Sequence, residues 1–173
     1  TFYGLIARRT LNMDTRLAPL NTAPNPRVDA LPNVQRALEL ARIGERDLAG
    51  EHLRHQARLG SPADHAGLVA VAKRLDLAAT QHFLAHFGQP GSQVPAAARY
   101  PRPNWTPRDG WRIDPALGFA HALQESNFRA EAVSQAGAVG LMQVLPSTRD
   151  LISRSRGIAM GDLRDPATNM TFG

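Results

Sequence analysis

Apolar positions in the first half of the chain recur with a helical period. The stretch 33–60 suits two amphipathic helices, and Gly44 fits the turn between them. Ser61 and Pro62 are typical of the start of a third helix, and Gly88 of the end of a fourth. We expect the first two helices to bury Val34, Leu38, Leu40, Ala41, Leu48, Leu53 and Leu59.

A short repeat indicates how these helices are arranged. The trio Asp-Leu-Ala at 47–49 recurs at 76–78, each time near the start of the second helix of a pair. This favours stacked helical hairpins of the solenoid type, although two unrelated hairpins would give the same echo. Residues 88–110 contain five prolines and few periodic apolar positions, which predicts an irregular linker.

A helix with a carboxylate at its far end follows the linker. Asp114 and Pro115 are a capping carboxylate and a proline at the first helical position, and Ser126-Asn127 favour a helix end just after Glu125. We expect this helix to bury Leu117, Phe119, Ala120 and Leu123.

The position of Glu125 suits a general acid. Its carboxylate would face the negative end of the helix dipole, and Phe128, Leu141 or Met142 would desolvate it. Both effects favour a protonated side chain that can donate to a leaving group. The alternative is an ordinary solvent-exposed charge.

A loop of small residues comes next. Gly137 and Gly140 would let backbone amides approach a ligand closely, Gln143 offers a donor and an acceptor, and Ser134 offers a hydroxyl. Together they suit a groove for a polar, uncharged, amide-bearing substrate. The alternative is a simple turn.

Composition and weaker signals exclude several other functions. The net charge is +5, but the arginines are scattered, which favours solvated faces over a nucleic-acid surface. There is no cysteine, and no apolar run approaches the roughly 20 residues of a membrane span. The chain opens without methionine, so we expect a targeting segment to be absent from it.

Two histidine pairs and three aromatic residues call for a separate interpretation. His82 and His86 have the spacing of a metal pair, and His52 and His55 lie three residues apart. No third ligand is evident for either pair. We therefore predict packing or surface roles for these histidines, and neither a metal nor a cofactor. Three aromatic residues are more typical of pinning the linker than of stacking on sugars: Tyr100, Trp105 and Trp111.

The order of these features is more specific than any one of them. Pro146 and Asp165-Pro166 each favour another helix start. In sequence, the features are Glu125-Ser126, Phe128, Ser134, Gly137-Ala138, Gly140-Leu141-Met142-Gln143, Pro146, Thr148, Asp165-Pro166 and Asn169. This order closely resembles the lytic transglycosylase family, in particular the soluble, superhelical kind that cleaves bacterial peptidoglycan. The likeness runs from near Tyr100 to Gly173, roughly the first half of that family's lysozyme-like catalytic domain.

The resemblance implies roles for the matching residues. Glu125 matches the family's single catalytic acid/base, and Ser134 and Gln143 match residues that line the glycan site. Asp165 and Asn169 match a structural motif. The motif that shapes the cleft matches Gly140, Leu141 and Met142.

The chain also departs from the family pattern. Leu145 stands where the family often has methionine. A tyrosine near the catalytic acid and a Tyr-Asn-Ala-Gly stretch would lie beyond Gly173, so we expect only about half of the family's site within this chain.

The resemblance implies a route that needs one carboxylate. Glu125 would protonate the bond between N-acetylmuramic acid and N-acetylglucosamine, the substrate's acetamido group would assist, and a 1,6-anhydro sugar would form. Most glycosidases need a second carboxylate, and Asp114, Glu131 and Asp150 are not clearly placed for that role. Two alternatives stay open: a goose-type lysozyme-like hydrolase, and a helical-repeat scaffold that only binds glycan or protein.

The predicted architecture is all-α. Residues 1–100 would form a superhelical linker domain of solenoid-like hairpins, begun by a helix at TFYGLIARR, and residues 101–173 the N-terminal half of a lysozyme-like domain. The expected partner is the glycan strand of peptidoglycan in the periplasm of a Gram-negative bacterium, with no nucleic acid and no membrane span.

Overall fold

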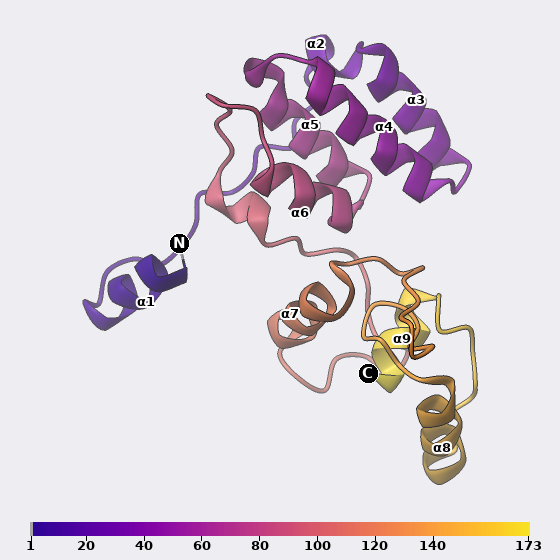
Figure 1. The fold of residues 1–173 in the computed structure, drawn as a ribbon. Coiled ribbons are helices and arrows are strands. Elements are labelled where there is room, and N and C mark those ends of the chain that lie inside the picture. Colours follow the sequence, from indigo (N-terminus) through magenta and orange to yellow (C-terminus); the bar gives the residue numbers. More distant parts are fainter. Residues whose placement is uncertain (1) are drawn as a thin grey trace.

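The computed structural model describes residues 2–173, and its regular elements in that range are all helices. The chain forms an upper group of helices, α2 to α6, and a lower group, α7 to α9, with α1 set apart beyond an extended segment (Figure 1). The predicted all-α class is confirmed. The elements are α1 (Phe2–Thr10), α2 (Pro26–Asp29), α3 (Pro32–Arg42), α4 (Arg46–Leu59), α5 (Pro62–Arg74), α6 (Ala78–His86), the 3₁₀ helix η1 (Ala96–Arg99), α7 (Pro115–Ser126), α8 (Pro146–Arg156) and α9 (Pro166–Phe172).

The upper group consists of two stacked helical hairpins. Helix α3 packs on α4 and α5 on α6, and α4 also contacts both α5 and α6, so the second helix of one pair lies against the next pair. Gly44 takes the left-handed φ of +89° that the turn between α3 and α4 requires. The hairpins predicted from the periodicity are therefore present. Their shared core includes Val28, Val34, Leu53, Leu68, Val69, Val71 and Leu84.

Two apolar positions in α4 differ from the expectation. Leu48 is 45% exposed and Leu59 is 65% exposed, whereas Leu53 between them is fully buried. The reason is that α4 begins only at Arg46 and turns Ala49, Leu53, Gln56 and Ala57 toward its neighbours, at helical spacings that exclude both leucines.

The linker is tied down along the ends of α5 and α6. The Lys73 ammonium donates to the Arg102 carbonyl at 2.8 Å, and the Asn104 amide donates to the Asp76 carboxylate at 3.1 Å. The Gln81 amide nitrogen donates to the Ala98 carbonyl at 2.9 Å inside the structure. The irregular linker predicted for this segment thus follows a defined path along the upper group of helices.

The lower group has two small apolar clusters. One joins Ala122, Phe128, Leu141 and Met170 to Ala78 at the start of α6, and the other joins Val144, Leu163 and Phe172. Trp105 and Trp111 pack against the first cluster, which supports the pinning role predicted for them, whereas Tyr100 is half-exposed. Since this cluster includes α6, the domain division near residue 100 stays a prediction.

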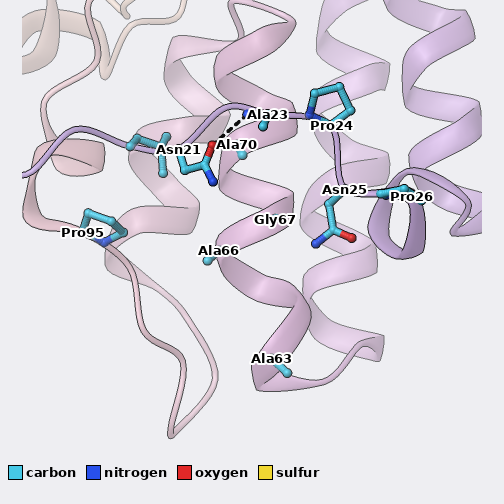
Figure 2. Close-up of a pocket in the computed structure, with 11 residues that line it drawn as sticks. Asn21, Ala23, Pro24, Asn25, Pro26, Ala63, Ala66, Gly67, Ala70 and Pro95 are labelled. Atoms are coloured by element: carbon cyan, nitrogen blue, oxygen red, sulfur yellow. Dashed lines mark hydrogen bonds between the residues drawn. The ribbon is translucent and has the colours of Figure 1, made fainter.

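A cavity of about 370 Å³ lies in the upper group, between the segment 20–26, α5 and Pro95 (Figure 2). Its lining is small and mostly apolar, including Ala63, Ala66 and Gly67 of α5. None of its residues comes from α7 or later, so it does not belong to the region that holds Glu125. Within the described residues, no helix is long and apolar enough to cross a bilayer.

Candidate active site

The two ends of α7 are built as the sequence predicts. The Asp114 carboxylate accepts a hydrogen bond from the Ala116 amide at 2.9 Å, and Pro115 occupies the first helical position. At the other end Asn127 is left-handed, and its amide donates to the Leu123 carbonyl at 3.0 Å. Glu125 is therefore the penultimate residue of the helix.

The buried face of α7 differs from the prediction. Leu117 is 51% exposed and Ala120 is exposed, while Phe119 and Leu123 are partly buried. The fully buried positions are the small residues Gly118, Ala122 and Ser126. Gly118 is covered by the Trp111 ring, and a Cβ there would collide with it, so the tryptophan selects a small-residue face that a count of apolar residues does not reveal.

The predicted desolvation of Glu125 is wrong for the described chain. Its side chain is exposed and makes no hydrogen bond or ion pair with any described residue. Leu141 is fully buried in the cluster beneath α7, and Phe128 turns toward Trp105 at a ring-centroid distance of 6.3 Å. The apolar groups expected to cover the carboxylate are thus used in packing, and the carboxylate faces solvent.

The loop after α7 forms a short antiparallel ladder. Val139 is bridged on one side to Val133 and on the other to Val144. Ser134 closes the first turn, since its amide donates to the Ala138 carbonyl at 2.9 Å and its hydroxyl oxygen accepts from the Ala138 amide at 3.0 Å. Ser134 is exposed, so its hydroxyl proton stays available to a ligand.

Asn169 of α9 clamps the second turn of this ladder. Its side-chain oxygen accepts from the Met142 amide at 2.7 Å, and its nitrogen donates to the carbonyls of Val139 and Leu163, each at 2.8 Å. Gly140 has a φ of +79°, and a Cβ there would collide with the Asn169 amide. The glycine is required both by its dihedral angle and by the clamp. Asn169 is fully buried, in agreement with a structural role.

Gln143 has its amide nitrogen already engaged. The nitrogen donates to the Gly140 carbonyl at 2.9 Å and to the Ala132 carbonyl at 3.3 Å. The backbone of Gln143 is left-handed, with a φ of +47°, which turns the side chain back over its own loop. Only the side-chain oxygen is left for a ligand, so Gln143 can accept a hydrogen bond there but offers less as a donor than the sequence suggested.

The structure brings part of the predicted site together. Leu141 and Met142 join the cluster that contains Ala122 and Leu123, so the Gly-Leu-Met-Gln turn lies against the helix that carries Glu125. Leu141 is a packing residue, and Met142 is partly buried between the two lower clusters. No hydrogen bond joins Glu125 to Ser134 or Gln143 within the described part of the chain.

The carboxylates nearest to Glu125 in sequence have other partners or lie far from it. Glu131 pairs with Arg164 at 3.3 Å and Asp150 with Arg149 at 2.7 Å. Asp114 caps the opposite end of α7, roughly 16 Å from Glu125 by helical rise. This exceeds the separations of paired carboxylates in glycosidases.

The histidine pairs are held by protein groups. The Nδ1 atom of His82 lies 3.1 Å from the Arg99 carbonyl, and that of His86 lies 2.9 Å from the His82 carbonyl. Since a carbonyl only accepts, both Nδ1 atoms carry the proton. Burial lowers the pKa of His82, which favours its neutral form. Among the described residues, no group of three or more His, Asp or Glu is arranged to hold a metal ion.

The part of the chain that holds this helix-and-turn arrangement matches a known domain. Residues 106–173 match the family model of the transglycosylase SLT domain. The resemblance to lytic transglycosylases predicted from the order of the motifs is confirmed. The match begins close to the boundary at residue 100 inferred from the sequence.

Curated relatives match part of the chain. The chain is 41% identical over 68 residues to the endo-type membrane-bound lytic murein transglycosylase A of two Klebsiella pneumoniae strains. This alignment covers 36% of the chain and 34% of each relative, so the chain spans about a third of the length of these proteins.

Solved structures match nearly the whole chain. The 70-kDa soluble lytic transglycosylase of Escherichia coli has a TM-score of 0.73 at 22% identity, and a complex of a 70-kDa soluble lytic transglycosylase with bulgecin A has a TM-score of 0.72 at 23% identity. An inactive mutant of the lytic transglycosylase Slt from Pseudomonas aeruginosa has 0.67 at 24%. Each alignment covers 99% of this chain and 29% of the solved one. At these identities the likeness shows a shared fold over both helical groups.

Proposed function

We propose that the protein is a lytic transglycosylase that cleaves the bond between N-acetylmuramic acid and N-acetylglucosamine in peptidoglycan. One observation carries the proposal: within the segment that matches the SLT domain, a single unpaired carboxylate, Glu125, stands exposed at the end of α7. The turn at 140–143 packs against the same helix.

In this proposal Glu125 acts first as an acid and then as a base. It transfers its proton to the glycosidic oxygen as the bond from that oxygen to the muramoyl carbon breaks. The neighbouring acetamido oxygen stabilises the positive charge on the sugar. The carboxylate then removes the proton from the 6-hydroxyl, whose oxygen closes the 1,6-anhydro ring. No water is consumed, and Glu125 ends protonated as it began.

Because Glu125 is exposed, the bound substrate itself would have to shield the acid from water. A general acid must hold its proton until it transfers that proton to the leaving group. A sugar ring bound over the carboxylate would exclude water and favour its protonated form. The negative end of α7 would act in the same direction.

Ser134 and Gln143 are the proposed ligand contacts beside this acid. The Gln143 oxygen would accept from an N–H or O–H of the glycan, because its nitrogen is occupied by two backbone carbonyls. The Ser134 hydroxyl would donate to a sugar oxygen. Gly140 and Met142 would shape the turn that presents them, and Leu141 would hold it from beneath.

The Glu125→Gln variant of the complete protein tests the catalytic role. It should bind purified peptidoglycan like the wild type. It should release muropeptides at a rate at least about 100-fold lower, since it lacks the acid. Glu131→Gln is the matched control, because that exposed carboxylate pairs with Arg164 and should be dispensable. Cleavage by the Glu125→Gln variant at a rate near the wild type would exclude this role.

Mass spectrometry of the released muropeptides separates the remaining alternatives. Anhydro ends indicate transglycosylation and reducing ends indicate a lysozyme-like hydrolysis. The latter has less support, since the nearest carboxylates are engaged or distant. Binding without any release would favour a scaffold. A periplasmic location and a division into a superhelical domain of residues 1–100 and a catalytic part of residues 101–173 belong to the same proposal.

A further inference from the structure

Phe128 connects the superhelix to the end of the helix that carries Glu125. It lies three residues after Glu125 and is 5% exposed. Its amide donates to the Ala122 carbonyl at 3.1 Å, and its φ of +62° follows the φ of +51° at Asn127. Two consecutive left-handed residues without glycine cost free energy, so the surrounding contacts must hold this chain end in place.

Those contacts come from residues outside α7, the helix that carries Glu125. The ring of Phe128 meets the ring of His82 in α6 edge to face, with centroids 6.2 Å apart, and the ring of Trp105 on another side at 6.3 Å. Ala78 of α6, which is 4% exposed, belongs to the same apolar cluster as Phe128 and Ala122. The superhelix therefore supplies one wall of the pocket that holds Phe128.

His82 is itself fixed in this position. Its Nδ1–H donates to the Arg99 carbonyl at 3.1 Å, so the ring is oriented by the linker while its edge meets Phe128. His86 packs against it with ring centroids 4.3 Å apart. The half-buried imidazole thus acts as a rigid spacer between η1 and the end of α7.

We propose that His82 is a positioning residue for catalysis: it acts through Phe128 to hold the last turn of α7, and so the Glu125 carboxylate, in its working place. This rests on the proposed function of Glu125. The upper group of helices would then help to position the catalytic residue, in addition to being linked to the lower group. Misplacement of a catalytic group by about 1 Å is enough to lower a rate by up to about 100-fold.

Two substitutions in the complete protein separate the ring contact from the hydrogen bond. His82→Phe keeps an aromatic wall against Phe128 and loses the bond to Arg99. His82→Gln can keep that bond and loses the ring. We expect His82→Gln to lower kcat about tenfold with little change in KM, because Glu125 acts in the transition state, and His82→Phe to retain most of the kcat. His55→Ala, on the exposed face of α4, is the control and should match the wild type.

Hydrogen exchange gives a readout that does not depend on activity. The amides of Asn127 and Phe128, which bond to Leu123 and Ala122, should exchange faster in His82→Gln and as in the wild type in His82→Phe. A kcat of His82→Gln equal to the wild type, or the reverse order of the two variants, would overturn the proposal. If the wild type cleaves no peptidoglycan, the proposed function fails. The exchange pattern then decides whether His82 holds the end of α7.

Discussion

The upper and lower helical groups are stabilised in different ways. In α3–α6 the described core is one continuous apolar cluster, formed by helices that pack face to face. In α7–α9 the apolar clusters are small, α8 buries no residue, and much of the order comes from capping groups, the ladder at 132–144 and the Asn169 clamp. The first group resembles a folded scaffold, and the second a loop-rich site mounted on it.

This difference bears on function. A turn such as 140–143 cannot be held by apolar packing alone, because its peptide groups must find partners. The buried Asn169 and the ladder supply these partners. Since α6 also packs against Phe128, the lower group depends on the upper one for part of its support. The predictions below test this contrast, beginning with the largest effect.

A core truncation should affect the upper group of helices most. Leu53→Ala removes a fully buried side chain between α4 and its neighbours, and we expect the free energy of unfolding of that group to fall by about 4 kcal/mol. Chemical denaturation of the full chain, with hydrogen exchange to locate the change, measures it. Leu48→Ala is the control in the same helix, and its loss should be well below that of Leu53→Ala because Leu48 is half-exposed. Equal losses would contradict the packing described.

A polar truncation should do comparable damage to the lower group. Asn169→Ala leaves the Met142 amide and the Leu163 carbonyl without their partner, and leaves the Val139 carbonyl with only its bond from the Val144 amide. We expect a loss of about 3 kcal/mol and faster exchange at the Met142 amide. Asn21→Ala is the matched control, because Asn21 accepts from Ala23 on an exposed segment and should cost little. An unchanged Met142 exchange rate would exclude the clamp.

The smallest effect is expected at the cap of α9. The Asp165 carboxylate accepts from the Thr168 amide at 2.9 Å and from the Thr168 hydroxyl at 2.6 Å. Asp165→Ala should lower the free energy of unfolding by about 1 kcal/mol at neutral pH, whereas Asp165→Asn should retain most of the capping. Thermal denaturation of the three proteins at matched pH measures both differences.

The same cap predicts a pH dependence. The Thr168 hydroxyl bond holds the pKa of Asp165 below its ordinary value, with a smaller contribution from Arg108. A carboxyl group with a lowered pKa in the folded state contributes stability at neutral pH and loses it as the pH falls through that lowered pKa. The difference between wild type and Asp165→Ala should therefore shrink in acid. A difference that stays constant down to low pH would show that the ionised carboxylate is not responsible.

The repeating parts of the chain were predictable because their signals are local. Helical periodicity located α3 and α4, and cap-and-proline pairs located the starts of α7 and α9. The same reasoning failed for the buried face of α7, where Trp111 covers Gly118 and leaves Leu117 in solvent. A residue outside the helix determined that face, so no count of apolar positions within the helix could find it.

The sequence by itself determined where α7 and α9 begin, the place of Glu125 at the end of α7, and the likeness to the transglycosylase SLT domain, because caps and motif order are properties of neighbouring residues. Only the tertiary structure decided that Glu125 faces solvent, that Asn169 engages the turn at 140–143, and that His82 meets Phe128. These outcomes depend on which surfaces come together after folding. Burial and long-range hydrogen bonding are set by that assembly and not by the local chain.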